Sequence, residues 1–98
     1  MNEIILYRGI GGSISVEIKD RCLFIFDHIF SGEMEKECWY DFDESNTNRV
    51  IELLTNNESD FEEVLLKNYS GVNGFERLKK FFIDNGIEYK YRSYSSIS

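Results

Sequence analysis

The chain has 98 residues, of which 42% are hydrophobic, 30% are charged and 15% are aromatic. This length supplies one hydrophobic core and leaves no room for a second, so we expect a single domain over residues 1–98. The net charge of −7 opposes direct binding to nucleic acid.

Two further exclusions concern the compartment. No apolar run approaches the roughly 18 residues of a membrane span, and the N-terminus lacks a signal-peptide pattern. We therefore expect a cytoplasmic protein with no membrane contact. Cys22 and Cys38 are too few for a disulfide scaffold and are expected to be reduced, although one bridge between neighbouring strands stays open.

The first 42 residues predict four strands. Residues 2–8 are strand formers, and the glycine-rich run at 9–12 predicts a turn. Residues 13–19 alternate apolar and polar side chains, as a half-buried strand does. Residues 22–30 are apolar on both faces as far as Asp27, which suits a central strand covered by helices on one side. Residues 34–42 alternate again, with Met34, Cys38, Tyr40 and Phe42 on one face.

The remainder predicts helices and one closing strand. Asp43 or Ser45 can cap a first helix, and Ser59 with Glu62 forms a predicted capping box for a second helix that runs to about residue 68. A loop over residues 70–74 is expected before a third helix that ends near Gly86. Residues 87–94 alternate as a final strand, and the last four residues should fray. The predicted fold is α+β, an antiparallel-rich sheet of about five strands with two or three helices packed on one face.

Negative charge collects in the middle of the chain. Residues 27–63 carry twelve acids against two bases, a net of −10, whereas residues 71–98 have a net of +2. In the strand over residues 34–42, three carboxylates share a face with Trp39, which suits contact with a basic partner. The alternative is that Trp39 packs on a neighbouring strand and the acids are only solvated. The candidate partner-binding residues are Glu33, Glu35, Glu37, Trp39, Asp41, Asp43, Glu44, Asp60, Glu62 and Glu63.

No pattern predicts catalysis or a metal. His28 is the only histidine, and the adjacent Asp27 would point to the opposite face of a regular strand, so it could not orient the imidazole. Two cysteines and one histidine at these spacings do not suit a zinc site, and residues 41–44 lack the spacing of a calcium loop. We expect no catalytic residue, no metal and no cofactor.

The segments WYDFDESNTNRVIELL and FERLKKFFIDNGIEYKY carry a resemblance to a known group of proteins. The matching residues are Phe42, Asp43, Asn46, Thr47, Val50, Leu53 and Leu54, followed by Phe75, Phe81 or Phe82, Asn85, Gly86, Ile87 and Tyr89. Over roughly residues 34–92 the chain resembles small bacterial immunity proteins of toxin–immunity pairs, including those of contact-dependent growth inhibition.

The resemblance implies a protein without enzymatic activity that binds and neutralises one cognate toxin domain in the cytoplasm. Many such toxins are nucleases, including tRNases and other RNases, and the basic cleft of a nuclease would suit an acidic partner. Two alternatives come from other classes, a small enzyme that uses His28 and a homodimer of unassigned role.

Overall fold

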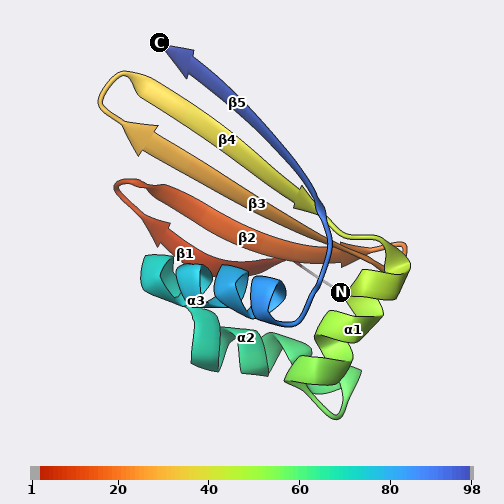
Figure 1. The fold of residues 1–98 in the computed structure, drawn as a ribbon. Helices are drawn as coiled ribbons and strands as arrows, with labels where there is room; N and C mark the ends of the chain where they lie inside the picture. The colour runs from red at the N-terminus through yellow and green to blue at the C-terminus, as the bar shows by residue number, and fades with distance from the viewer. Residues whose placement is uncertain (1–2, 98) are drawn as a thin grey trace.

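The computed structural model describes residues 3–97. Over these residues the elements are β1 (Ile4–Gly9), β2 (Gly12–Lys19), β3 (Cys22–Ser31), β4 (Met34–Asp41), α1 (Glu44–Leu54), the 3₁₀ helix η1 (Glu58–Asp60), α2 (Phe61–Tyr69), α3 (Gly71–Asp84) and β5 (Lys90–Ile97). The strands form one antiparallel sheet in the order β1-β2-β3-β4-β5, with the helices on one side (Figure 1). The predicted α+β fold is confirmed.

Two-residue turns join the first four strands. Asp20 and Arg21 both have positive φ, 52° and 66°, and Gly32 has φ 62°. Positive φ in these two turns matches the right-handed twist of the strands, so the β2–β3 and β3–β4 hairpins close without splaying. The turns therefore set the register that places each side chain on one face or the other.

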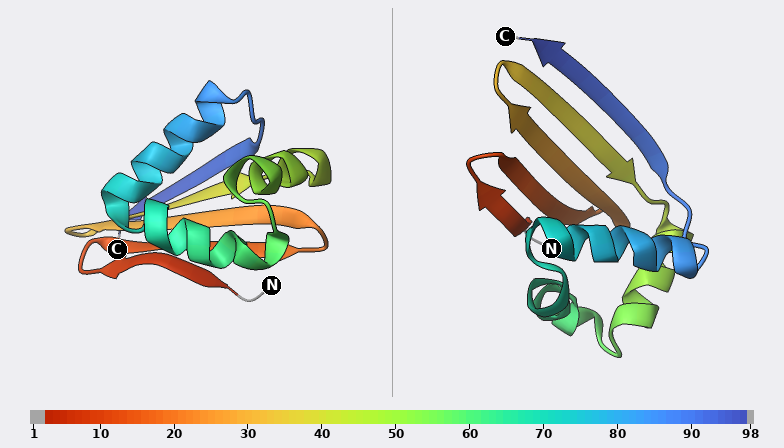
Figure 2. Two further views of the ribbon diagram at one scale, coloured as in Figure 1. Left: turned by 90° about the horizontal axis from the view of Figure 1, so that it is seen from below. Right: turned by 60° about the vertical axis from the view of Figure 1, so that its left-hand side comes forward.

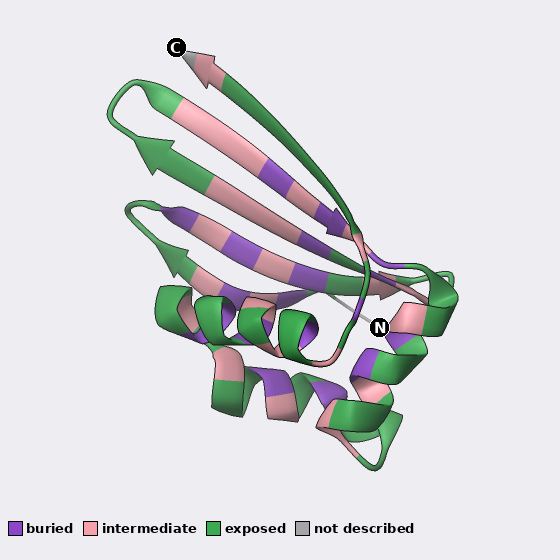
Figure 3. Ribbon diagram, viewed as in Figure 1, coloured by how far each residue is buried: buried purple, intermediate pink, exposed green. Residues whose placement is uncertain are grey.

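The hydrophobic core lies between the sheet and the helices (Figure 3). Every second strand residue supplies it, and aromatic rings from distant segments meet there. Tyr40 packs edge-on against Phe75 at 5.5 Å between ring centroids, and Phe42 meets Phe82 at 5.0 Å. Burying a side chain of this size stabilises the fold by roughly 1.5–3 kcal/mol.

A buried hydroxyl joins the first helix to the sheet. Among the described residues, Thr47 is the polar one in the buried set, with 1% of its surface exposed. Its Oγ1 accepts a hydrogen bond from the backbone N–H of Leu23 at 2.9 Å, and the Leu23 carbonyl accepts from the N–H of Phe42 at 2.9 Å. Asp43 caps α1, because its side chain accepts from the N–H of Asn46. This confirms the first of the two predicted caps.

The junction between α2 and α3 corrects one prediction. The loop expected over residues 70–74 is reduced to Ser70, and α3 begins at Gly71. Gly71 has φ 82°, which favours glycine, and a Cβ at Gly74 would lie 2.4 Å from the carbonyl carbon of Tyr69. The two glycines permit a tight corner between α2 and α3. From the sequence alone, the same glycines predict a loop.

Two further predictions differ from the structure, one about the start of α2 and one about the extent of the last strand. Ser59 lies inside η1, where the Asn57 side chain accepts from its N–H, and α2 has no side-chain cap bond. The predicted capping box therefore does not form. The final strand begins at Lys90 and includes Ser95, which pairs with Lys36 through the backbone ladder. Fraying is predicted for residues 95–98, but the part of this tail that the structure describes lies in the ladder, whose hydrogen bonds do not require strand-favouring side chains; residue 98 lies outside the described residues.

The sheet is longer than the helical layer that covers it. The ends of β3, β4 and β5 project beyond α3, and the structure measures 43 × 25 × 25 Å (Figure 2). Ile29 and Met34 are exposed in this projecting part. The helices therefore leave one whole face and one end of the sheet uncovered.

We predict that Thr47→Val destabilises the protein by about 1–3 kcal/mol, because the buried N–H of Leu23 loses its acceptor. Thr47→Ser keeps the hydroxyl and should cost less. Urea unfolding of both variants measures the difference. Equal losses in the two variants would show that packing, and not the hydrogen bond, matters at this position.

We predict that Gly12→Ala destabilises the protein by more than about 3 kcal/mol. Gly12 has φ 143°, and a Cβ there would lie 1.9 Å from the carbonyl oxygen of His28. Gly11→Ala is the matched control, since nothing lies within 4 Å of its added Cβ. Thermal unfolding should separate the two variants, and similar melting temperatures would contradict the tight approach.

Candidate functional site

The face of the sheet opposite the helices carries the candidate site. We call it the open face. Strand pairing places the following residues on it, Ser13, Ser15 and Glu17 from β2, Phe24, Phe26, His28 and Phe30 from β3, Glu35, Glu37, Trp39 and Asp41 from β4, and Lys90, Arg92 and Tyr94 from β5. Several large apolar side chains remain accessible here, with exposed fractions of 38% for Phe24, 47% for Phe30 and 61% for Tyr94. Exposed aromatic side chains gathered on one uncovered face are typical of a binding surface.

Trp39 is held at the centre of the open face. Its indole lies 5.6 Å from the ring of Phe26, and the guanidinium carbon of Arg92 lies 5.0 Å above it. Arg92 also pairs with Asp41, with 3.1 Å between Nη2 and Oδ2. Trp39 therefore packs on its neighbouring strand and is half-buried, as one of the two interpretations of its position predicts.

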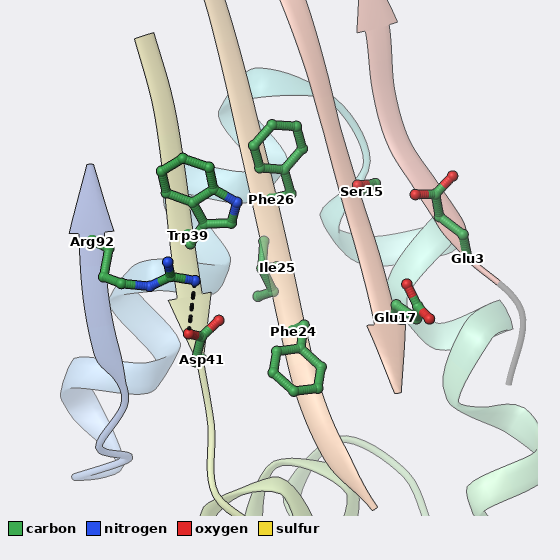
Figure 4. A pocket seen from close by; sticks show the side chains of 9 residues that line it. All are labelled: Glu3, Ser15, Glu17, Phe24, Ile25, Phe26, Trp39, Asp41 and Arg92. Carbon is green, nitrogen blue, oxygen red and sulfur yellow. Dashed lines mark hydrogen bonds and ion pairs between the residues drawn. The ribbon is translucent and has the colours of Figure 1, made fainter. Parts of the chain in front are cut away.

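A hollow of about 220 Å³ lies beside this tryptophan (Figure 4). Phe24 and Phe26 rise from β3 in its middle. Carboxylates stand on both sides, Glu3 and Glu17 toward β1 and β2 and Asp41 toward β5. An aromatic floor with a carboxylate rim has the chemistry that binds the side chain of an arginine or a lysine.

His28 lies further along the same face. Its Nε2 bonds to Oε1 of Glu35, and its ring lies 5.6 Å from Phe26 and 4.2 Å from Phe30. Asp27 pairs with Cys38 on the helix-covered side, so it cannot orient the imidazole, as the strand alternation predicts. A histidine bonded to a neighbouring strand accounts for these contacts without a general base.

The structure divides the predicted acidic set between two surfaces. Glu35, Glu37, Trp39 and Asp41 share the open face. Glu33 lies in the β3–β4 turn. The others lie in or beside the helical layer behind the sheet, and these are Asp43, Glu44, Asp60, Glu62 and Glu63 (Figure 1).

The acids of the helical layer have partly structural roles. The Asp43 side chain accepts from the N–H of Asn46, and this hydrogen bond lowers the pKa of its carboxyl. Glu44 pairs with Arg21 at 3.5 Å between Oε1 and Nη1. Asp60, Glu62 and Glu63 are exposed. This second surface contributes charge but lacks the aromatic hollow of the open face.

Sequence reasoning missed part of the site. Phe24, Phe26 and Glu17 line the hollow, and Arg92 adds a cation from the last strand. The available signal was the double-sided apolar pattern of residues 22–30. That pattern predicts a central strand covered by helices on one side, as the structure has it, and it leaves the apolar side chains of the other face exposed as candidates for a site.

Comparisons with known protein families, curated proteins and solved structures found no match for this chain. Within residues 3–97, no helix combines the length and apolar character needed to cross a membrane.

Asp27 lies under the helices, and burial is the main cause that raises the pKa of its carboxyl. Lys79, Lys36 and His28 oppose this rise, whereas Glu76 adds to it. A carboxyl whose folded pKa exceeds its unfolded pKa stabilises the fold at low pH and does so less as the pH rises through the folded pKa.

We therefore predict that Asp27→Asn raises the free energy of unfolding at pH 7. The gain should shrink as the pH falls toward the unfolded carboxyl pKa of about 3.9, where aspartate takes up its proton. Urea unfolding at several pH values measures this. Asp60→Asn is the exposed control and should change little. A pH-independent difference for Asp27→Asn would contradict the assignment.

Proposed function

We propose that this chain is an immunity protein that binds and neutralises a basic toxin domain without catalysis. The observation that carries the proposal is the acid-rimmed aromatic hollow on the uncovered face of the sheet (Figure 4). Interfaces depend on a few anchors that combine apolar area with pairing of charge, and the hollow offers both. The resemblance of residues 34–92 to immunity proteins supports the same function.

The contact of Arg92 with Trp39 and Asp41 illustrates the chemistry. There the face already accommodates a guanidinium that stacks on an indole and pairs with a carboxylate. A lysine or arginine of the partner would enter the hollow beside it and meet Glu3 and Glu17 on the other side. In a nuclease toxin, a cation held in this way would no longer contact the phosphates of its RNA substrate.

The helical acids would act at longer range. Glu52, Glu58, Asp60, Glu62 and Glu63 are exposed on α1, η1 and α2. Nearby, Arg49 already donates to the backbone carbonyls of Asn85 and Gly86, at 2.8 and 3.2 Å. Exposed negative charge of this kind accelerates the encounter with a basic protein but contributes little to the bound state.

We predict that the double variant Glu3→Lys/Glu17→Lys protects poorly against a toxin domain that the unmodified chain neutralises. Reversing the rim charges should slow association by about tenfold or more at low salt and should also weaken the complex, because the partner's cation meets like charge. Stopped-flow association and a growth-rescue assay measure the two effects.

The matched control is Glu62→Lys/Glu63→Lys, which makes the same change in net charge on α2. Its association should slow less, and its complex, once formed, should dissociate at nearly the unmodified rate. Equal effects of the two doubles would remove the open face from the interface. No binding of the toxin domain by the unmodified chain would end the proposal.

A further inference from the structure

Three potential metal ligands converge at the projecting end of the open face. His28 on β3 stands directly opposite Glu37 on β4, and Glu35 lies two residues away along β4, on the same face. One ligand atom from each of the three side chains lies within 4.8 Å of the others. Neither the fold nor the proposed contact with a toxin requires this convergence.

We propose that His28, Glu35 and Glu37 bind a divalent transition-metal ion, with Zn²⁺ preferred over Mg²⁺ and Ca²⁺. Imidazole favours zinc and its neighbours in the first transition row, whereas Mg²⁺ and Ca²⁺ favour sites built from oxygen alone. Catalytic zinc sites use three protein ligands, and carboxylate oxygen joins imidazole nitrogen among them, as in sites of two histidines and one glutamate.

The distances suit such an ion after small side-chain rotations. Zinc bonds to nitrogen and carboxylate oxygen at about 2.0–2.2 Å, so tetrahedral ligand atoms stand about 3.3–3.6 Å apart. The three ligand atoms now lie within 4.8 Å of one another, so the widest pair would close by at most about 1.5 Å, and the hydrogen-bonded atoms of His28 and Glu35 would move apart to admit the ion. Each glutamate has three side-chain torsions, which can close that gap without a backbone shift.

The surroundings hold the histidine in a position to bind. Its ring packs between Phe26 and Phe30, and 20% of its side chain is exposed. Nε2 points at Glu35, so the ion would take the place of the proton that now joins these two groups. Ligands on two paired strands keep their spacing better than ligands on a loop, and so less order must be gained on binding.

Three protein ligands leave a coordination position for water or for a group from another molecule. Cys38 does not compete for the ion, because it is buried on the helix-covered side. The site is separate from the hollow, whose acidic rim is formed by Glu3, Glu17 and Asp41. The inference therefore stands or falls independently of the proposed toxin contact.

The test is calorimetric titration of Zn²⁺ into the full chain after treatment with a chelator and desalting. We expect one ion per chain and a melting temperature that rises with zinc concentration. Glu37→Gln should weaken binding by about tenfold or more, while the melting temperature of the metal-free protein stays near that of the unmodified chain. Cobalt(II) should give visible d–d absorption that this variant loses.

Glu17→Gln is the matched control, because it removes a carboxylate from the same face outside the cluster. It should bind zinc as the unmodified chain does. The proposal is overturned by an absence of stoichiometric binding at micromolar zinc, by equal losses in Glu37→Gln and Glu17→Gln, or by Mg²⁺ binding as tightly as Zn²⁺.

Discussion

The hydrogen bond from the Leu23 amide to the Thr47 hydroxyl is the constraint on which the layering depends. It joins the start of the central strand to the first turn of α1, and the Phe42 amide bonds to the same residue's carbonyl. Both backbone groups of Leu23 are thereby satisfied just where β4 ends, as buried groups must be. The chain leaves the sheet on one side at this point. Every later helix packs on that side, and the other face stays open.

Because the helices cover only one face of the sheet, large aromatic side chains on the other face are exposed to solvent. On the covered face, Tyr40 and Phe75 make the core. On the open face, Phe24 and Phe30 remain accessible to water. Exposed aromatic area of this kind lowers solubility and is typical of a surface that another molecule covers. Carboxylates distributed among the rings give such a surface a preference for cations.

Local patterns predicted the parts of the structure that local physics decides. The alternation of residues 13–19, the cap at Asp43 and the opposite orientations of Asp27 and His28 all follow from backbone periodicity and are confirmed. The corner at Gly71 and Gly74 could not be predicted, because its reason is the approach of another helix. The proximity of His28, Glu35 and Glu37 depends on the register between two strands, and the division of the acids depends on which side of the sheet the helices take. Neither feature can be predicted from the residue pattern within a single segment.

The position of β5 has a consequence for how the molecule is made. β1 to β4 can zip together one hairpin after another, since each strand pairs with the next in the chain. β5 reaches its place only after the helices, when Lys90 comes to lie opposite Asp41. The length of that interval depends on the closure of a loop of about fifty residues. Until β5 pairs, the outer edge of β4 has unpaired backbone groups that any nearby strand can bind. Charged glutamates on β4 meanwhile oppose the pairing of one nascent chain with another.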